Sequence, residues 1–228
     1  DTAITETFFG PQYDIHGGGI GLIFPHHECE IAQQEAATGK TPFVRYWLHA
    51  GHLKIDGKKM SKSLGNFITI QDLLKRTKPE VFRLFAMQTH YHSPVNYTER
   101  GLSQVETARE RLTEFVLRLR ALKPKGGPPL KRDEPRLAER GGENVGMSSA
   151  IAKARKDFYD ALADDFNTPS ALAAIFTLIN KYQKSIFDLP KREATAILKN
   201  VFNLLKILGL EFKSQKIPKE ILVLLDNI

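Results

Sequence analysis

The sequence contains a single cysteine, Cys29, so no disulfide bond can form within the chain. One lone thiol is typical of proteins in reducing compartments, and we expect a cytoplasmic location. No apolar run approaches the roughly 18 residues of a membrane-spanning helix, which argues against a membrane protein. The opening stretch DTAITETFFG has no basic segment followed by an apolar one, so no secretory signal is present there. The chain does not begin with methionine, and we expect it to start inside a larger protein.

The composition is that of a folded chain with a basic surface. Of the 228 residues, 42% are hydrophobic and 26% are charged, which is enough to bury a core and argues against global disorder. The net charge is +7. This excess favours an anionic partner such as a nucleotide or a nucleic acid, although a modest lysine excess is also common on other soluble proteins.

Residues 1–96 alternate between strand and helix patterns. The pattern predicts a strand that stops at the glycines 17–19, a helix that ends before Gly39, and one or two strands within 43–57. Thr69 and Asp72 form a capping-box pattern before a helix, and a further helix is expected from about Pro79. This order is typical of a parallel α/β sheet.

Residues 97–228 have helical periodicity throughout and no convincing strand pattern. We expect helices over 97–122, 148–164, 169–187 and 191–208, packed as a bundle. The stretch 123–146 is rich in proline, glycine and charge, and is predicted to be a loop or mobile linker. The cations of this stretch could contact nucleic-acid phosphates, or they could equally well belong to a solvated linker with interspersed acids. These cations are Lys123, Lys125, Lys131, Arg132, Arg136 and Arg140.

Two short stretches carry most of the chemistry. KKMSKSLGNF, residues 58–67, is either a solvated surface turn or a loop whose lysines grip a polyphosphate. In DIHGGGIGLIFPHHECEIAQ, the glycines allow a ligand to approach the backbone. His26 and Glu30 are four residues apart on one helix face, where they can share a Zn²⁺ ion, although such a pair is more often an exposed ion pair.

The stretches DIHGGG, FPHHE.E.AQ and KMSKSLGNF, in this order and spacing, resemble cysteinyl-tRNA synthetase, a class I aminoacyl-tRNA synthetase. DDFNTPSAL, residues 164–172, resembles the helical domain of the same family. The resemblance implies an α/β plus all-α chain: residues 1–96 as the second half of a class I nucleotide-binding, Rossmann-like fold with the lysine loop, and 97–228 as an antiparallel helical bundle.

The resemblance implies ATP-dependent activation of L-cysteine to cysteinyl adenylate, followed by transfer to tRNA(Cys) during protein biosynthesis. ATP enters with Mg²⁺, and Lys62, assisted by Lys59, stabilises the charge on the leaving pyrophosphate. Zn²⁺ held by His26 and Glu30 takes the substrate thiolate and selects cysteine over serine. His16 and Gly18 are expected at the substrate and ATP site.

The sequence also departs from the family pattern. HAGH, residues 49–52, matches a class I signature but lies on a predicted strand, so we interpret His49 and His52 as structural. Asp1 stands where the family has a zinc-ligand cysteine, and Cys29 is interpreted as unrelated to zinc. Gly21 replaces an aspartate expected to bind the ATP ribose.

We expect the N-terminal half of the catalytic domain and the C-terminal anticodon-contacting domain to be missing, so that the chain alone is inactive and residues 1–85 expose apolar faces. Two alternatives to a cysteinyl-tRNA synthetase portion stay open. One is a non-catalytic paralogue that only binds tRNA or a partner protein. The other is a ligase that joins cysteine to an amino sugar on the same scaffold.

Overall fold

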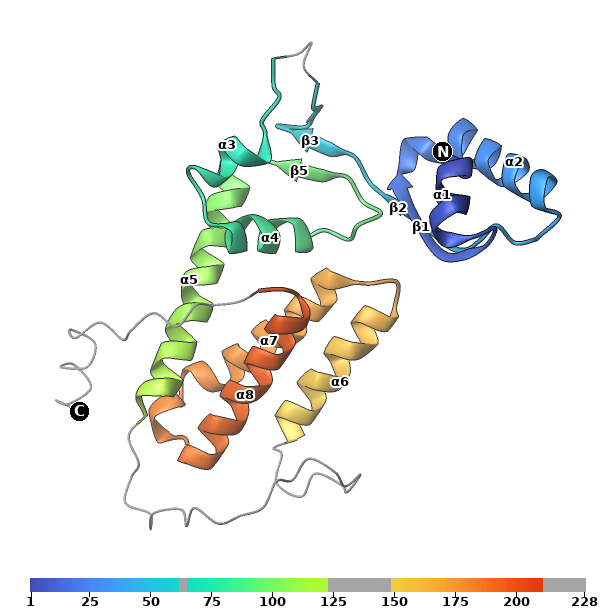
Figure 1. The fold of residues 1–228 in the computed structure, drawn as a ribbon. Helices are drawn as coiled ribbons and strands as arrows, with labels where there is room; N and C mark the ends of the chain where they lie inside the picture. The colour runs from blue at the N-terminus through green and yellow to red at the C-terminus, as the bar shows by residue number, and fades with distance from the viewer. Residues whose placement is uncertain (62–64, 123–148, 211–228) are drawn as a thin grey trace, which may run out of the picture. The chain divides into compact units, whose positions relative to one another are not determined.

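The computed structural model describes residues 1–61, 65–122 and 149–210 (Figure 1). By its internal contacts the chain divides into two compact units, of which the first comprises Asp1–Arg76 and Thr89–Gly101. The second comprises Thr77–Gln88 and the chain after Gly101. The domain boundary predicted between residues 96 and 97 stays a prediction, and the predicted linker at 123–146 with its cations lies outside the described residues.

The first unit opens with a parallel β-α-β arrangement, which Figure 1 shows in blue. Helix α1 (Thr2–Phe9) precedes strand β1 (Tyr13–Gly19), and helix α2 (Glu28–Thr38) leads to strand β2 (Val44–Ala50). Tyr13 of β1 pairs with Val44, and the register runs on to Gly19 opposite Ala50. The strand therefore continues through the glycines at which we predicted it to stop, because β2 supplies pairing partners along its whole length.

A second, three-stranded sheet follows in the first unit. Strand β3 (Leu53–Ile55) pairs antiparallel with β4 (Lys58–Lys59) and parallel with β5 (Val95–Tyr97). The hairpin turn between β3 and β4 is Asp56-Gly57, both at positive φ, as a tight two-residue hairpin requires. Helix α3 (Ile70–Leu74) is capped by Thr69, whose hydroxyl accepts a hydrogen bond from the Asp72 amide at 3.0 Å, so the predicted cap is confirmed.

The second unit is helical among its described residues. Helix α4 (Pro79–Met87) has proline at its start, where no hydrogen-bond donor is needed, and α5 (Glu99–Ala121) enters the unit after Gly101. Helices α6 (Ser149–Ala163), α7 (Thr168–Gln183) and α8 (Lys191–Ile207) lie side by side in Figure 1. The single helix predicted over 169–187 is interrupted: α7 ends at Gln183, and a short 3₁₀ turn, Ile186–Asp188, follows.

Burial differs sharply between the units. Many large apolar side chains of α5 to α8 are almost completely buried, including Phe115, Phe158 and Ile197 at no more than 1% exposure. In the first unit Phe8 and Phe24 are more than 75% exposed, and other large apolar side chains there are also uncovered, among them Ile4, Phe9, Ile15, Ile23, Tyr46 and Ile70. The predicted exposure of apolar faces in residues 1–85 is confirmed.

Candidate metal and substrate site

The start of α2 brings the predicted metal pair together. His26 lies in a π-helical turn (Ile23–His27) directly before α2, and its Nε2 is 3.5 Å from Glu30 Oε1, one turn along the chain. Asp1 approaches from the start of α1, with its Oδ2 3.3 Å from the same His26 nitrogen. These three side chains can offer ligand atoms that all lie within 4.8 Å of one another, which is the geometry of a candidate metal site.

Glu30 also faces a second histidine pair. His16 Nε2, on β1, is 3.7 Å from Glu30 Oε2, and His16, His27 and Glu30 form another group whose ligand atoms lie within 4.8 Å. Glu30 is only 5% exposed, and its Oε2 is buried without a hydrogen-bond partner. Because an unsatisfied buried carboxylate oxygen is costly, this atom is poised to accept a ligand or a proton donor.

A cluster of aromatic rings holds these histidines in place. His27 Nδ1 lies 2.8 Å from His49 Nε2, so one ring donates a hydrogen bond to the other. The Trp47 ring lies 4.8 Å from His16 and 4.9 Å from His27, between centroids. Burial, aided by the neighbouring His16 and His49, lowers the pKa of His27, which therefore stays neutral near pH 7.

Gly18 is positioned directly against this cluster. A Cβ atom on Gly18 would lie 2.6 Å from Cε1 and 3.0 Å from Nε2 of the His27 ring, which is too close for either residue to keep its place. The glycine is therefore explained by its contact with His27. Its predicted role in ATP binding stays a prediction.

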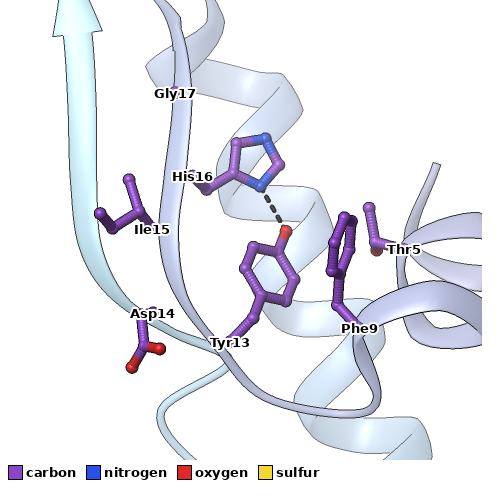
Figure 2. A pocket seen from close by; sticks show the side chains of 7 residues that line it. All are labelled: Thr5, Phe9, Tyr13, Asp14, Ile15, His16 and Gly17. Carbon is purple, nitrogen blue, oxygen red and sulfur yellow. Dashed lines mark hydrogen bonds between the residues drawn. The ribbon is translucent and has the colours of Figure 1, made fainter.

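A pocket of about 480 Å³ opens beside β1 (Figure 2). Its lining is mostly apolar and comprises Thr5, Phe9, Tyr13, Asp14, Ile15, His16 and Gly17. The Tyr13 hydroxyl is hydrogen-bonded to His16 Nδ1, as the dashed line in Figure 2 marks. The Nδ1 atom of His16 thus faces the Tyr13 hydroxyl at the pocket, whereas its Nε2 atom faces Glu30. His16 therefore lies between the pocket and the candidate metal group of His26 and Glu30.

The lysine-rich stretch is described only in part. Lys59 is exposed at the end of β4, whereas Lys62 lies outside the described residues. Asn66 joins the two sides of the stretch: its Nδ2 donates to the Lys59 carbonyl at 3.2 Å, and its Oδ1 accepts from the Ser61 amide at 2.9 Å. Gly65 adopts a left-handed backbone with φ 65° just before it, a conformation that favours glycine.

The sequence prediction found part of this site and missed the rest. His26, Glu30 and His16 are brought together, and Cys29 is exposed and belongs to neither candidate group. His27 and His49 were not predicted as a contacting pair. The doubled histidine in the sequence was the available signal for His27, but no local signal connects it with a residue on β2.

Family models match most of the chain. Residues 2–107 match the model described as "tRNA synthetases class I (C) catalytic domain", and residues 157–213 match the DALR domain. The cysteine–tRNA ligase of Thermococcus onnurineus (strain NA1) is 42% identical over 226 residues, covering 96% of this chain and 45% of that protein. The cysteine–tRNA ligase of Legionella pneumophila (strain Corby) is 44% identical over 200 residues, which cover 88% of this chain and 37% of that protein. The chain thus spans less than half the length of these curated relatives.

The fold agrees with these matches. The structure is similar to the crystal structure of the ternary complex of Agrobacterium radiobacter K84 agnB2 LeuRS-tRNA-LeuAMS, with a TM-score of 0.62 and 20% identity. That match covers 84% of this chain and 25% of the other. The fold is therefore that of class I aminoacyl-tRNA synthetases with a helical DALR domain. On these grounds the chain belongs to the cysteine–tRNA ligase family of class I aminoacyl-tRNA synthetases.

Proposed function

We propose that the chain is part of an enzyme that activates L-cysteine with ATP and transfers the cysteinyl group to tRNA(Cys) in the cytoplasm. In this proposal residues 1–96 are the second half of a Rossmann-like nucleotide-binding fold, and residues 97–228 are an antiparallel helical bundle. The observation that carries it is the approach of His26 to the buried Glu30 carboxylate, next to the pocket beside β1.

The side chains at this position suit a zinc ion. Imidazole nitrogen and carboxylate oxygen are ordinary zinc ligands, and the buried Glu30 Oε2 lacks a hydrogen-bond partner that would compete for it. A zinc ion bound here would stabilise a substrate thiolate, which a serine hydroxyl replaces poorly. Of the chain's own residues, His26 and Glu30 would hold the ion, and His16, fixed by the Tyr13 hydroxyl, would orient the substrate beside the pocket.

The lysine-rich stretch is proposed to act on ATP, which is bound with Mg²⁺. An ammonium group that strengthens its contact as negative charge develops on the leaving pyrophosphate lowers the barrier to adenylate formation. We assign this role to Lys62, with Lys59 assisting. The Asn66 hydrogen bonds to Ser61 and Lys59 support this assignment, because they tie the backbone at Lys59 and Ser61 to the side chain of Asn66, which follows Lys62 in the sequence.

Selective cysteine binding tests this proposal. The zinc-loaded chain is expected to bind L-cysteine, and to bind L-serine at least about tenfold more weakly, because a thiolate suits zinc better than a hydroxyl does. Titration calorimetry measures the affinity for each of the two amino acids. His26→Ala should lose the preference, whereas His52→Ala, an exposed histidine outside both candidate metal groups, should keep it. Equal binding of the two amino acids would refute the proposal.

A second candidate function is tRNA binding without catalysis. Gly21 favours it, because glycine has no side chain with which to bind the ATP ribose. In that case tRNA binding would weaken steeply with salt as bound cations are displaced, and L-cysteine would not bind. The third alternative, an amino-sugar acceptor, is less well supported, because the similar proteins are cysteine–tRNA ligases.

A further inference from the structure

The carboxyl ends of β1 and β2 lie side by side. The two strands are parallel, and their last residues, Gly19 and Ala50, are register partners. Open parallel sheets bind ligands at this edge, beyond the carboxyl ends of their strands. A 3₁₀ turn, Ile20–Leu22, follows β1 here, and the pair Gly51-His52 follows β2. Side chains on these two short segments are therefore placed to contact a ligand at the edge.

His52 and Gly21 face each other across this edge. A Cβ atom on Gly21 would lie 3.6 Å from Cε1 and 3.9 Å from Nε2 of the His52 ring. Apart from the neighbouring residues in the chain, no other side chain of the described residues comes within 4 Å of that point. Both residues are exposed. The ring edge that carries Nε2 therefore borders a space that the missing side chain of Gly21 leaves open to a ligand.

The backbone of His52 is anchored to a neighbouring segment. Its carbonyl oxygen accepts a hydrogen bond from the Val95 amide at 3.1 Å, and the Gly51 amide donates one to the Tyr91 carbonyl at 2.7 Å. Strand β3 begins at the next residue, Leu53, and leads through β4 into the lysine-rich stretch. His52 thus presents an exposed ring from a fixed backbone, directly before the segment that carries the phosphate-binding lysines of the proposed function.

We propose that the His52 imidazole binds the ribose of ATP through a hydrogen bond between Nε2 and a ribose hydroxyl. This inference rests on the proposed function and deepens it, because His52 makes a contact for which Gly21 has no side chain. Imidazole Nε2 donates or accepts a hydrogen bond, depending on the tautomer, and a hydroxyl group can do either. His52 therefore has a binding role in place of the structural role that the sequence alone suggested.

Equilibrium dialysis of the 228-residue chain with Mg–ATP tests this contact. His52→Ala is expected to weaken Mg–ATP binding roughly 3-fold to 10-fold, which is the effect of losing one hydrogen bond between uncharged groups. His52→Gln, whose amide again offers a donor and an acceptor, should bind Mg–ATP within about twofold of the wild type. Tyr46→Ala is the matched control, because Tyr46 is exposed on β2 away from its carboxyl end, and should leave the affinity unchanged.

Two further ligands separate the ribose from the rest of ATP. The 2′,3′-dideoxy analogue of ATP lacks both ribose hydroxyls, so the wild type and His52→Ala should bind it equally. Mg–tripolyphosphate, which has no nucleoside, should also bind both chains equally. If His52→Ala weakens the binding of either ligand as much as it weakens the binding of ATP, the contact is not with the ribose hydroxyls, and the proposal is overturned.

Cysteine binding separates this contact from the proposed function. His52 belongs to neither candidate metal group of the described residues, so His52→Ala should keep its zinc while it loses affinity for ATP. Selective L-cysteine binding together with unchanged ATP affinity in His52→Ala would overturn only the ribose contact. The expected ATP results without any binding of L-cysteine would keep that contact and refute the proposed function. A folded wild-type chain that binds no Mg–ATP would also overturn the ribose contact.

Discussion

The purified 228-residue chain is expected to catalyse no cysteine-dependent exchange between ATP and pyrophosphate. The chain spans only 45% of the Thermococcus onnurineus relative, so groups from the remaining length of such a protein are not available to the ATP site. Gly21 removes a further expected contact with the ribose. The assay measures labelled pyrophosphate incorporated into ATP with and without L-cysteine, and exchange above the no-cysteine control would contradict the expectation.

Gly21→Asp isolates the contribution of that one position. A Cβ at Gly21 would lie 3.6 Å from His52 Cε1, which is an ordinary contact, so the substitution is sterically tolerated. A carboxylate that accepts the ribose hydroxyls is expected to tighten Mg–ATP binding by about 1.5–3 kcal/mol, or roughly 10-fold to 150-fold. Equilibrium dialysis compares this variant with Gly21→Ala, which fills the same space without an acceptor. Equal ATP affinity in the two variants would show that the position does not contact the nucleotide.

Gly51→Ala is expected to destabilise the first unit by about 3 kcal/mol or more, because overpacking against rigid backbone cannot be relieved by side-chain movement. A Cβ at Gly51 would lie 2.4 Å from the carbonyl carbon and oxygen of Ser93 and 2.7 Å from the Pro94 nitrogen. At the same point the Gly51 amide donates to the Tyr91 carbonyl at 2.7 Å, and the Val95 amide donates to the His52 carbonyl at 3.1 Å. The two segments cannot separate without losing these bonds.

Urea unfolding followed by the fluorescence of Trp47, the chain's one tryptophan, measures this effect within the first unit. Gly19→Ala is the matched control, since a Cβ there meets no atom within 4 Å and its backbone has a negative φ of −77°. The control should unfold close to the wild-type midpoint. An unchanged midpoint for Gly51→Ala would mean that the backbone at Gly51 does not contact Ser93 and Pro94 as closely as the structure shows.

Local patterns in the sequence predicted most of the helices and the proximity of His26 to Glu30. His26 and Glu30 are only four residues apart and meet across one turn of the chain, and the Thr69 cap involves residues only three apart. Apolar periodicity likewise predicted α5 and α6 within a few residues of their bounds. In each case the interactions that decide the structure lie within one turn or one helix.

What the sequence did not predict depends on contacts between distant residues. Strand β5 is short, and it is a strand because its residues pair with β3, some forty positions earlier in the chain. The His27–His49 hydrogen bond arises from the register of β1 and β2, which brings Gly18 opposite His49. The approach of Asp1 to His26 depends on how α1 is placed against α2, which no periodicity encodes. Pairing and packing, rather than propensity, decided these features.

Elemental analysis of zinc in the purified chain tests whether His26 and Glu30 belong to a working metal site of a cysteine–tRNA ligase. We expect close to one zinc ion per chain, loss of that zinc in His26→Ala, and its retention in His52→Ala. Because the ligands named here all lie within residues 1–30, the result does not require any other part of such an enzyme. A chain that is folded but free of zinc, or zinc retained in His26→Ala, would show that His26 and Glu30 do not hold a zinc ion.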